Sequence, residues 1–260
     1  MKLFSGLASA WAWVALVSGV IVSFAVVAPV WVVTVPFDRR RLVAGRTFRL
    51  CGVMLAALHP YWSFAVSGPI VRARKRRTVF VSNHESQADP FLVSRLPWEM
   101  KWLSKEVIFK IPCLGWCMYL VGDVPIKRGQ KDSVGVAMQR MRRWLDEDVP
   151  VMMFPEGTRS ADGALGTFKD GAFRLAIEAQ ADLFPLALRG TREALPKHAW
   201  RFGRSRALVR CGTPISTEGR TMDDIEELKD QVRAQINALR DQLDVELGLL
   251  PDGTAKRSVA

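Results

Sequence analysis

The residues best suited to chemistry are a histidine and an aspartate five positions apart, His84 and Asp89. A neutral histidine, whose pKa is ordinarily about 6.5, is a competent general base at physiological pH. A carboxylate bonded to the other ring nitrogen fixes the imidazole tautomer and stabilises the imidazolium that forms when the base takes a proton. A turn between the two residues would bring their side chains together. In a plainer interpretation, Asp89 only caps the next helix and His84 is an ordinary loop residue.

A second group of polar residues lies in Phe-Pro-Glu-Gly-Thr-Arg-Ser, residues 154–160. Gly157 lets the backbone approach a ligand closely. Arg159 offers a planar fork that suits bidentate phosphate binding, and the Thr158 hydroxyl adds a donor. We expect Glu156 to orient Arg159 or to bond a substrate hydroxyl. The pattern indicates a phosphate site; the alternative is an ordinary turn with a surface arginine.

Both groups directly follow segments that read as strands. Thr78–Ser82 (TVFVS) precedes the first group, and the apolar run Val149–Phe154 precedes the second. Asp89-Pro90 then opens a helix, with Asp89 as the predicted N-cap and proline at the first helical position. The two groups therefore lie on loops at the carboxyl ends of strands, where α/β folds place their ligands.

The rest of the C-terminal part alternates in the same way. Further helices are expected at 133–147, 168–180 and 221–247, and further strands at 183–189 and 207–211. The apolar residues of the last helix recur at three- and four-residue spacing, which indicates core packing. This alternation predicts an α/β domain with a mostly parallel sheet flanked by helices.

The N-terminal part reads as a membrane segment. Leu3–Phe37 is 35 residues without a charge. A helix from Trp13 to Trp31 would span about 27 Å, close to the thickness of a bilayer core. A second uncharged stretch, Leu50–Val71, has basic residues on both sides, so a full crossing would place one basic cluster on the wrong side. We therefore expect this stretch to lie in the interface or to enter one leaflet and return. The first stretch either spans the membrane or forms a shallow hairpin with the second.

The charge distribution supports a lipid partner. Of the formal net charge of +11, residues 1–77 carry eleven basic residues and one acid, whereas residues 78–260 carry 26 basic and 25 acidic residues. A nucleic-acid-binding protein would carry its basic stripe on the folded domain, so nucleic acid is not an expected partner. Basic clusters beside apolar runs indicate anionic lipid headgroups. The expected organisation is a membrane-associated segment (1–77), an α/β domain (78–250) and a disordered tail (251–260).

The motifs Asn-His-x4-Asp and Phe-Pro-Glu-Gly-Thr-Arg-Ser, about 70 residues apart and in this order, resemble those of the glycerophospholipid acyltransferase superfamily. The resemblance is to bacterial 1-acyl-sn-glycerol-3-phosphate acyltransferases and covers roughly residues 75–215. Further matching blocks are Lys105 with 111–115, 124–128, 168–172 and 184–187. The last block reads Phe-Pro-Leu-Ala here, where the family usually has Val/Ile-Pro-Val/Ile, which weakens that one assignment.

The resemblance implies a reaction and a set of roles. His84, helped by Asp89, would deprotonate the hydroxyl of a lysophospholipid, which then attacks a thioester directly. The binding residues would be those of the second motif and two nearby cations: Glu156, Gly157, Thr158, Arg159, Arg128 and Lys105. No cofactor is implied. The partners would be acyl-CoA or acyl-carrier protein, lysophosphatidic acid and anionic membrane lipids. The location would be the cell inner membrane, with the catalytic domain on the cytoplasmic side.

The sequence agrees with direct transfer, because it lacks the Gly-x-Ser-x-Gly motif of an acyl-enzyme mechanism. The acceptor could instead be another lysophospholipid or glycerol 3-phosphate. A metal-dependent lipid phosphatase or glycosyltransferase is disfavoured, since there are only three histidines and no His-Glu-x-x-His motif. A non-enzymatic protein that binds anionic lipids remains the alternative of another class.

Overall fold

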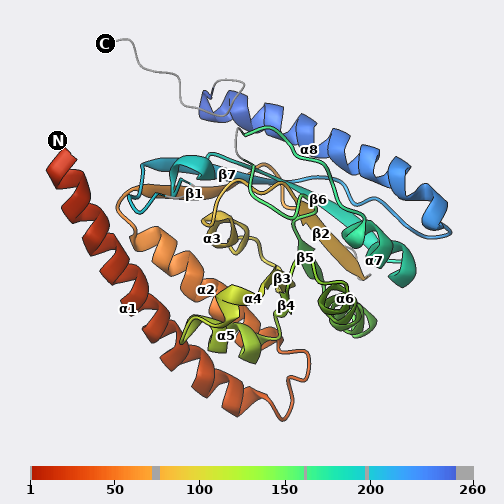
Figure 1. Cartoon of the computed structure of the whole chain (residues 1–260), viewed down its shortest axis with the longest axis horizontal. Helices are drawn as coiled ribbons and strands as arrows, with labels where there is room; N and C mark the ends of the chain where they lie inside the picture. Colours follow the sequence, from red (N-terminus) through yellow and green to blue (C-terminus); the bar gives the residue numbers. More distant parts are fainter. Residues whose placement is uncertain (1, 72–76, 161–162, 197–198, 250–260) are drawn as a thin grey trace.

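The structure, a computed structural model, describes residues 2–71, 77–160, 163–196 and 199–249 of the 260-residue chain. At its centre is one seven-stranded sheet with helices on both faces, and two long helices lie along one side (Figure 1). The expected tail at 251–260, His198 and the basic residues at 72–76 fall outside the described residues.

The sheet has the strand order β1-β7-β6-β2-β5-β3-β4. Neighbouring strands run parallel, except for β6 and β7, which are antiparallel. The central strand β2 is buried at all five positions, as expected for a parallel strand that is covered on both faces. The prediction of a mostly parallel α/β fold is confirmed. The strands are β1 (Trp62–Ser67), β2 (Thr78–Ser82), β3 (Lys101–Lys105), β4 (Val124–Ile126), β5 (Val151–Met153), β6 (Asp182–Arg189) and β7 (Ser205–Cys211).

The core has one layer on each face of the sheet. Side chains alternate along β2, so Val79 and Val81 join one cluster while Phe80 joins the other. Helices α6 (Lys131–Asp146), α7 (Gly171–Ala179) and α8 (Ile225–Leu247) cover the first face. Helices α2 (Leu42–Leu58) and α3 (Asp89–Val93) contribute to the second. The apolar stripe of α8 is buried against the sheet, which confirms its expected role in the core.

The N-terminal part forms a helix pair that packs on the domain. Helix α1 (Lys2–Thr34) lies beside α2 and against the short helix α5 (Leu114–Val121), which follows α4 (Glu106–Phe109) (Figure 1). Within α1, Ser9–Thr34 is long and apolar enough to cross a membrane, and only 11% of its most apolar window is buried.

The second uncharged stretch differs from its prediction. Helix α2 ends at Leu58, and Trp62–Ser67 is the edge strand β1, which pairs in parallel with β7. The interpretation of Leu50–Val71 as one membrane segment was therefore wrong in its second half. An edge strand with alternating burial can consist entirely of uncharged residues, which hides it beside an apolar helix. The sheet thus begins before residue 77.

Several predicted helix starts were also displaced. Helix α6 begins at Lys131, and the Ser133 hydroxyl accepts the Lys127 N–H at 2.9 Å instead of capping the helix. Helix α7 begins at Gly171 and not at residue 168, since the Lys169 N–H donates to the Pro155 carbonyl. Before α8, a 3-10 turn (Met222–Asp224) follows a capping box at Thr221. A second 3-10 turn, η1, spans Thr191–Glu193.

The predicted site residues lie at one edge of the sheet. Because β2, β5, β3 and β4 are parallel neighbours, their carboxyl ends lie at the same edge. His84 follows β2, and residues 154–159 follow β5. Lys105 ends β3, and Arg128 lies two residues beyond β4. The fold therefore places four widely separated segments at the same edge.

Candidate active site

The histidine and aspartate of the first motif form a direct pair. His84 Nδ1 lies 2.6 Å from Asp89 Oδ2, with the His84 side chain 16% exposed and the Asp89 side chain fully buried. Oδ2 also accepts the backbone N–H groups of Glu85, at 2.7 Å, and Ser86, at 3.0 Å. An oxygen that accepts from two N–H donors is an acceptor toward the imidazole as well, so Nδ1 carries the proton. The Nε2 lone pair is then available to take a proton from a ligand.

The second oxygen of Asp89 is bonded from another part of the fold. The Thr191 hydroxyl, fully buried at the start of η1, donates to Oδ1 at 2.5 Å. Asp89 itself is the first residue of α3, and Ala88 is the N-cap residue, with no side-chain cap. The predicted N-cap role of Asp89 was therefore wrong. Its carboxylate instead organises the turn that carries His84.

The residue before His84 fixes the loop to the sheet. The buried Asn83 amide donates to the Leu188 carbonyl at 3.0 Å and accepts the Leu188 N–H at 2.9 Å. This pairing continues the contact between β2 and β6 one residue beyond the end of β2. His84 therefore leaves the sheet from a backbone that is held on both sides, which limits how far its ring can move.

The imidazole rests on an aromatic surface. The His84 ring stacks on Phe154, with centroids 4.1 Å apart and planes 15° from parallel. Phe154 in turn meets Trp102 at 6.1 Å, and the guanidinium of Arg49, from α2, lies 5.3 Å from the Trp102 ring centroid. This edge of the sheet is thus connected through packed rings to the N-terminal helix pair.

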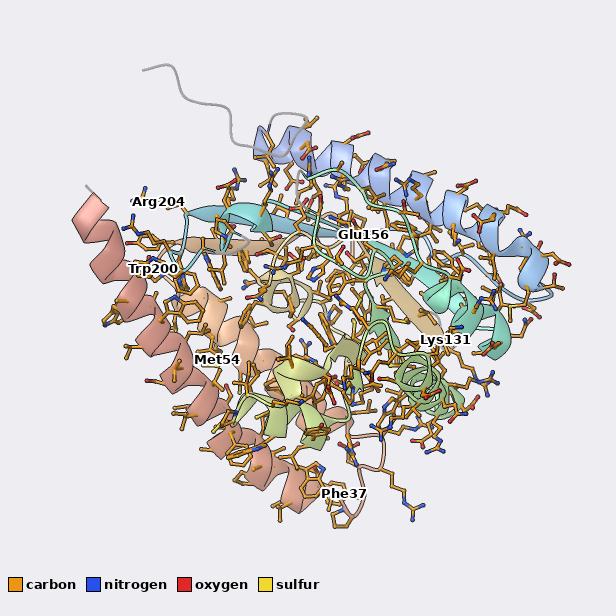
Figure 2. All side chains as sticks on the ribbon, viewed as in Figure 1. Phe37, Met54, Lys131, Glu156, Trp200 and Arg204 are labelled. Atoms are coloured by element: carbon orange, nitrogen blue, oxygen red, sulfur yellow. The ribbon has the colours of Figure 1, made fainter. Side chains whose placement is uncertain are left out.

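Glu156 has a different role from the one expected. Its Oε1 accepts the backbone N–H of His84 at 2.8 Å, and its Oε2 accepts the N–H of Gly166 at 2.8 Å. It is buried within the fold (Figure 2). Burial raises the pKa of Glu156, and the two N–H donors oppose that shift. Both oxygens are engaged by backbone, so Glu156 joins the loops of the two motifs. The Ser160 N–H also donates to the His84 carbonyl, at 2.9 Å.

The remainder of the second motif forms a glycine-dependent turn. Gly157 has φ +69°, in the left-handed region, and a Cβ placed there would lie 3.0 Å from both Cε and Nζ of Lys169. The Lys169 ammonium group therefore lies against the same turn that carries the exposed Thr158 and the half-buried Arg159. A guanidinium, an ammonium and a hydroxyl along one turn provide donors for an anionic group.

The two remaining predicted cations lie on neighbouring strands. Lys105 is the last residue of β3 and pairs in register with Ile126, the last residue of β4. Arg128 follows two residues later, and both side chains are exposed. In the sheet, β5 lies between β2, which leads to His84, and the neighbouring strands β3 and β4, which lead to Lys105 and Arg128.

A buried ionic network contacts Glu85 of the first motif. The Arg189 guanidinium donates to Glu85 Oε1 at 3.0 Å and to both oxygens of Asp244, on α8, at 2.5 and 2.6 Å. Burial raises the pKa of Glu85 to about 7, against the opposing charge of Arg189. The negative charge of Asp89 also raises the pKa of Glu85. Nearby, Arg240 of α8 donates to the Gly163 carbonyl.

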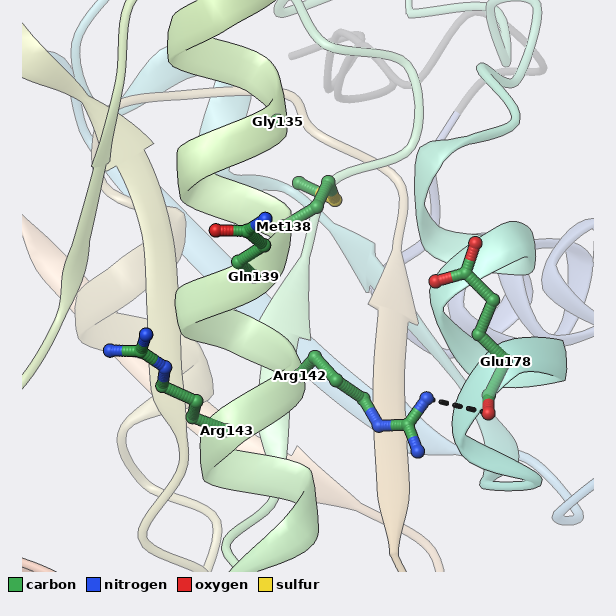
Figure 3. A pocket seen from close by; sticks show the side chains of 6 residues that line it. All are labelled: Gly135, Met138, Gln139, Arg142, Arg143 and Glu178. Carbon is green, nitrogen blue, oxygen red and sulfur yellow. Dashed lines mark hydrogen bonds between the residues drawn. The ribbon is translucent and has the colours of Figure 1, made fainter.

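Among the residues that the structure describes, no three His, Cys, Asp or Glu side chains gather closely enough to hold a metal ion. A hollow of about 500 Å³ lies between α6 and α7, where Arg142 donates to the Glu178 carbonyl at 2.6 Å (Figure 3). Its lining contains no residue of either motif, so we do not assign it to the site.

Sequence reasoning missed four residues of this site: Phe154 as a ring support, Thr191, Arg189 and Lys169. Phe154 was visible at the start of the second motif, and Lys169 stood in a block that resembled the family. Arg189 lies 104 residues after its partner Glu85, and Thr191 lies 102 residues after its partner Asp89, so neither carries a local signal.

Comparisons with known proteins show similarity to acyltransferases. Residues 63–189 match the acyltransferase family model. A chloroplastic 1-acyl-sn-glycerol-3-phosphate acyltransferase of Arabidopsis thaliana is 36% identical over 141 residues, 54% of this chain and 40% of that protein. The human 1-acyl-sn-glycerol-3-phosphate acyltransferase alpha is 34% identical over 157 residues, 60% of this chain and 56% of that protein. The chain thus spans roughly a third to just over half the length of the first curated relatives that it matches.

A solved structure extends the similarity to nearly the whole chain. The 1-acyl-sn-glycerophosphate (LPA) acyltransferase PlsC from Thermotoga maritima superposes with a TM-score of 0.77. The match covers 94% of this chain and 97% of that chain, at 21% sequence identity. At this identity the comparison establishes a shared fold.

Proposed function

We propose that this protein, whose residues 63–189 match the acyltransferase family model, acylates the sn-2 hydroxyl of 1-acylglycerol 3-phosphate, giving phosphatidic acid. The acyl donor is a thioester, either acyl-CoA or acyl-carrier protein. The observation that carries the proposal is the His84–Asp89 pair, which leaves Nε2 as a base at the edge where the second motif also lies.

The reaction proceeds by direct attack. His84 Nε2 takes the proton of the acceptor hydroxyl as its oxygen bonds to the thioester carbonyl carbon. The negative charge of Asp89 stabilises the imidazolium that results. The tetrahedral intermediate collapses with cleavage of the C–S bond, and the imidazolium returns its proton to the departing thiolate. The ester and the free thiol are the products, and His84 is neutral again.

The phosphate of the acceptor binds at the second motif. Arg159 supplies a bidentate fork, Gly157 a close backbone approach and Thr158 a hydroxyl donor. Lys105 and Arg128 add positive charge from the ends of β3 and β4. Glu156 contributes indirectly, because its carboxylate bonds the His84 backbone and so fixes the distance between the phosphate turn and the base.

The protein works at the cytoplasmic face of the inner membrane, with its N-terminal helices in one leaflet. Helix α1 is tied to the domain along its length: the Phe202 N–H donates to the Ser9 hydroxyl at 3.2 Å, and Val27 packs with α2 and α5. The Trp13 indole N–H also donates to the Trp200 carbonyl at 2.7 Å, beside the first half of α1 (Figure 2). A helix bound to the domain near both ends lies along the membrane surface more readily than across it.

The test is product analysis with defined lipids. Purified protein in anionic vesicles receives lysophosphatidic acid, with glycerol 3-phosphate or another lysophospholipid in parallel, and either thioester. We expect phosphatidic acid as the main product and a loss of at least about 100-fold in His84→Ala, because general bases contribute about 10²–10⁴. We expect Arg159→Ala to raise KM for the acceptor, with Arg174→Ala on α7 as the matched control. No product from any acceptor would reject the enzyme assignment in favour of a lipid-binding protein, and equal activity in His84→Ala would exclude His84 as the base.

A further inference from the structure

Four large apolar side chains on two consecutive short helices and the turn between them are half exposed. Val107 lies on α4, Ile111 between the helices, and Trp116 and Tyr119 on α5, each between 47% and 53% exposed. Single exposed apolar residues are normal, but a group of them on one small element marks a contact surface. We call these four residues the α4–α5 surface.

The surface belongs to a rigid turn. A Cβ placed at Gly115 would lie 2.0 Å from the Phe109 carbonyl oxygen, so only glycine allows the two helices to approach this closely. Cys113 has φ +62° between them, and the Leu114 N–H donates to the Pro112 carbonyl at 2.7 Å, closing a γ-turn. The backbone therefore holds Ile111 outward in a fixed geometry.

The inner side of α5 is committed to the N-terminal helices. Cys117 and Val121 pack in one cluster with Val27 of α1 and Ala44 of α2. The exposed residues of α5 thus lie on the side away from this cluster. At its margin the Trp116 ring meets Phe24 of α1 edge-on, with centroids 5.2 Å apart. The α4–α5 surface is therefore continuous with α1 (Figure 1).

The neighbouring charges fit an anionic lipid surface. Lys105 and Lys110 flank α4 and are exposed, and Arg39 and Arg40 are exposed in the turn between α1 and α2. The Arg41 guanidinium donates to the Tyr119 carbonyl at 2.8 Å, which ties this basic turn to α5. Tryptophan and tyrosine beside lysine and arginine are the residues that membrane interfaces favour.

We propose that the α4–α5 surface enters the lipid leaflet as a third membrane-contacting element beside α1 and α2. The proposal rests on the membrane location given under the proposed function. The α4–α5 surface lies next to the proposed phosphate site in the sequence, because β3 ends at Lys105 and α4 begins at the next residue. The leaflet then reaches the margin of the phosphate site, and a lysolipid enters the site from the membrane without its acyl chain crossing water.

Crosslinking with a photoactivatable lipid tests the contact directly. Vesicles of phosphatidylcholine and phosphatidylglycerol carry a lipid with a diazirine on its acyl chain, and the full-length protein is irradiated and digested with trypsin. The peptide Ile111–Lys127 contains three residues of the surface. Asp132–Arg140, from α6, contains the exposed Val134 and Val136 and is the internal control. We expect lipid adducts in Ile111–Lys127 at least tenfold above the control peptide.

The outcomes separate this proposal from the membrane location itself. Adducts in α1 or α2 without adducts in Ile111–Lys127 overturn the proposal and indicate that the surface meets water or another protein. Adducts in no peptide overturn the membrane location as well.

Kinetics provide a second measurement. We expect the double variant Val107→Asp with Ile111→Asp to raise KM for vesicle-bound lysophosphatidic acid at least tenfold. Its kcat/KM for a short-chain, monomeric acceptor should stay within twofold of the wild-type value. Val136→Asp is the matched control and should change neither. An equal loss with both acceptors would show that the substitutions damage the site and not the membrane contact, and would count against the proposal.

Discussion

Replacing Asp89 with asparagine isolates the charge behind the base. In the wild type, Oδ2 accepts N–H groups from His84, Glu85 and Ser86, and Oδ1 accepts the Thr191 hydroxyl. Asparagine can direct its carbonyl oxygen to the three N–H donors and its NH₂ to Thr191, whose hydroxyl accepts as well as donates. The hydrogen-bond pattern and the imidazole tautomer are then kept, and only the negative charge is lost.

The size of the effect follows from the geometry of the pair. Unit charges about 4 Å apart attract each other by about 4 kcal/mol at an effective dielectric constant of about 20. The neutral amide retains a hydrogen bond worth about 1 kcal/mol, so the transition state loses about 3 kcal/mol. At 1.36 kcal/mol for each factor of ten, kcat falls about 100-fold. KM for the lysolipid should change little, because Asp89 is fully buried and lies behind His84.

The assay is the initial rate of phosphatidic acid formation in vesicles, measured by mass spectrometry for variants with equal unfolding temperatures. Thr191→Val is the matched control, since it removes one hydrogen bond to Asp89 but keeps the charge, and its kcat should fall less than about tenfold. A kcat for Asp89→Asn within threefold of the wild-type value would refute the reasoning. It would mean that little positive charge develops on His84 in the rate-limiting step.

Three further substitutions test the surroundings of the base. The pKa of Glu85 is raised to about 7 from 4.5, so its contribution to wild-type stability should fall as pH rises from about 4.5 to 7 and then level off. Glu85→Gln still accepts from Arg189 but does not ionise. Its unfolding free energy relative to the wild type should therefore rise by about 3 kcal/mol between pH 4.5 and about 7. A difference in unfolding free energy that does not change with pH would contradict this. Gly157→Ala places a Cβ against Lys169 at a positive φ. It should raise KM for the acceptor about tenfold, with kcat less affected. An unchanged KM would show that this turn does not bind phosphate. Asn83→Ala leaves the Leu188 carbonyl and N–H of β6 without their side-chain partner. It should lower the unfolding free energy, measured in denaturant, by about 2–4 kcal/mol. A loss below about 1 kcal/mol would show that water replaces the amide.

The sequence predicted the parts of the fold that local patterns encode. The span of β2 was correct because five apolar or small residues precede a polar loop, and the bounds of β6 were correct within one residue. The short strands β3 and β4 were missed, since β3 (KWLSK) begins and ends with lysine and β4 (VPI) contains a proline, so neither stands out as an apolar run. The edge strand Trp62–Ser67 was assigned to the membrane because hydropathy does not distinguish an uncharged strand from the end of an apolar helix.

For the site, the sequence by itself determined which residue types are available for chemistry and that a short turn could bring His84 and Asp89 together, because a spacing of five residues is a local matter. Only the tertiary structure decided what holds that pair in place. Glu156 bonds a backbone N–H that lies 72 residues away, and Thr191 reaches Asp89 across 102 residues. Such contacts depend on strand order and burial, which no local spacing encodes. The candidate residues could therefore be named from the sequence, whereas the contacts that fix their geometry became visible only once the parallel strands had brought their carboxyl ends to one edge.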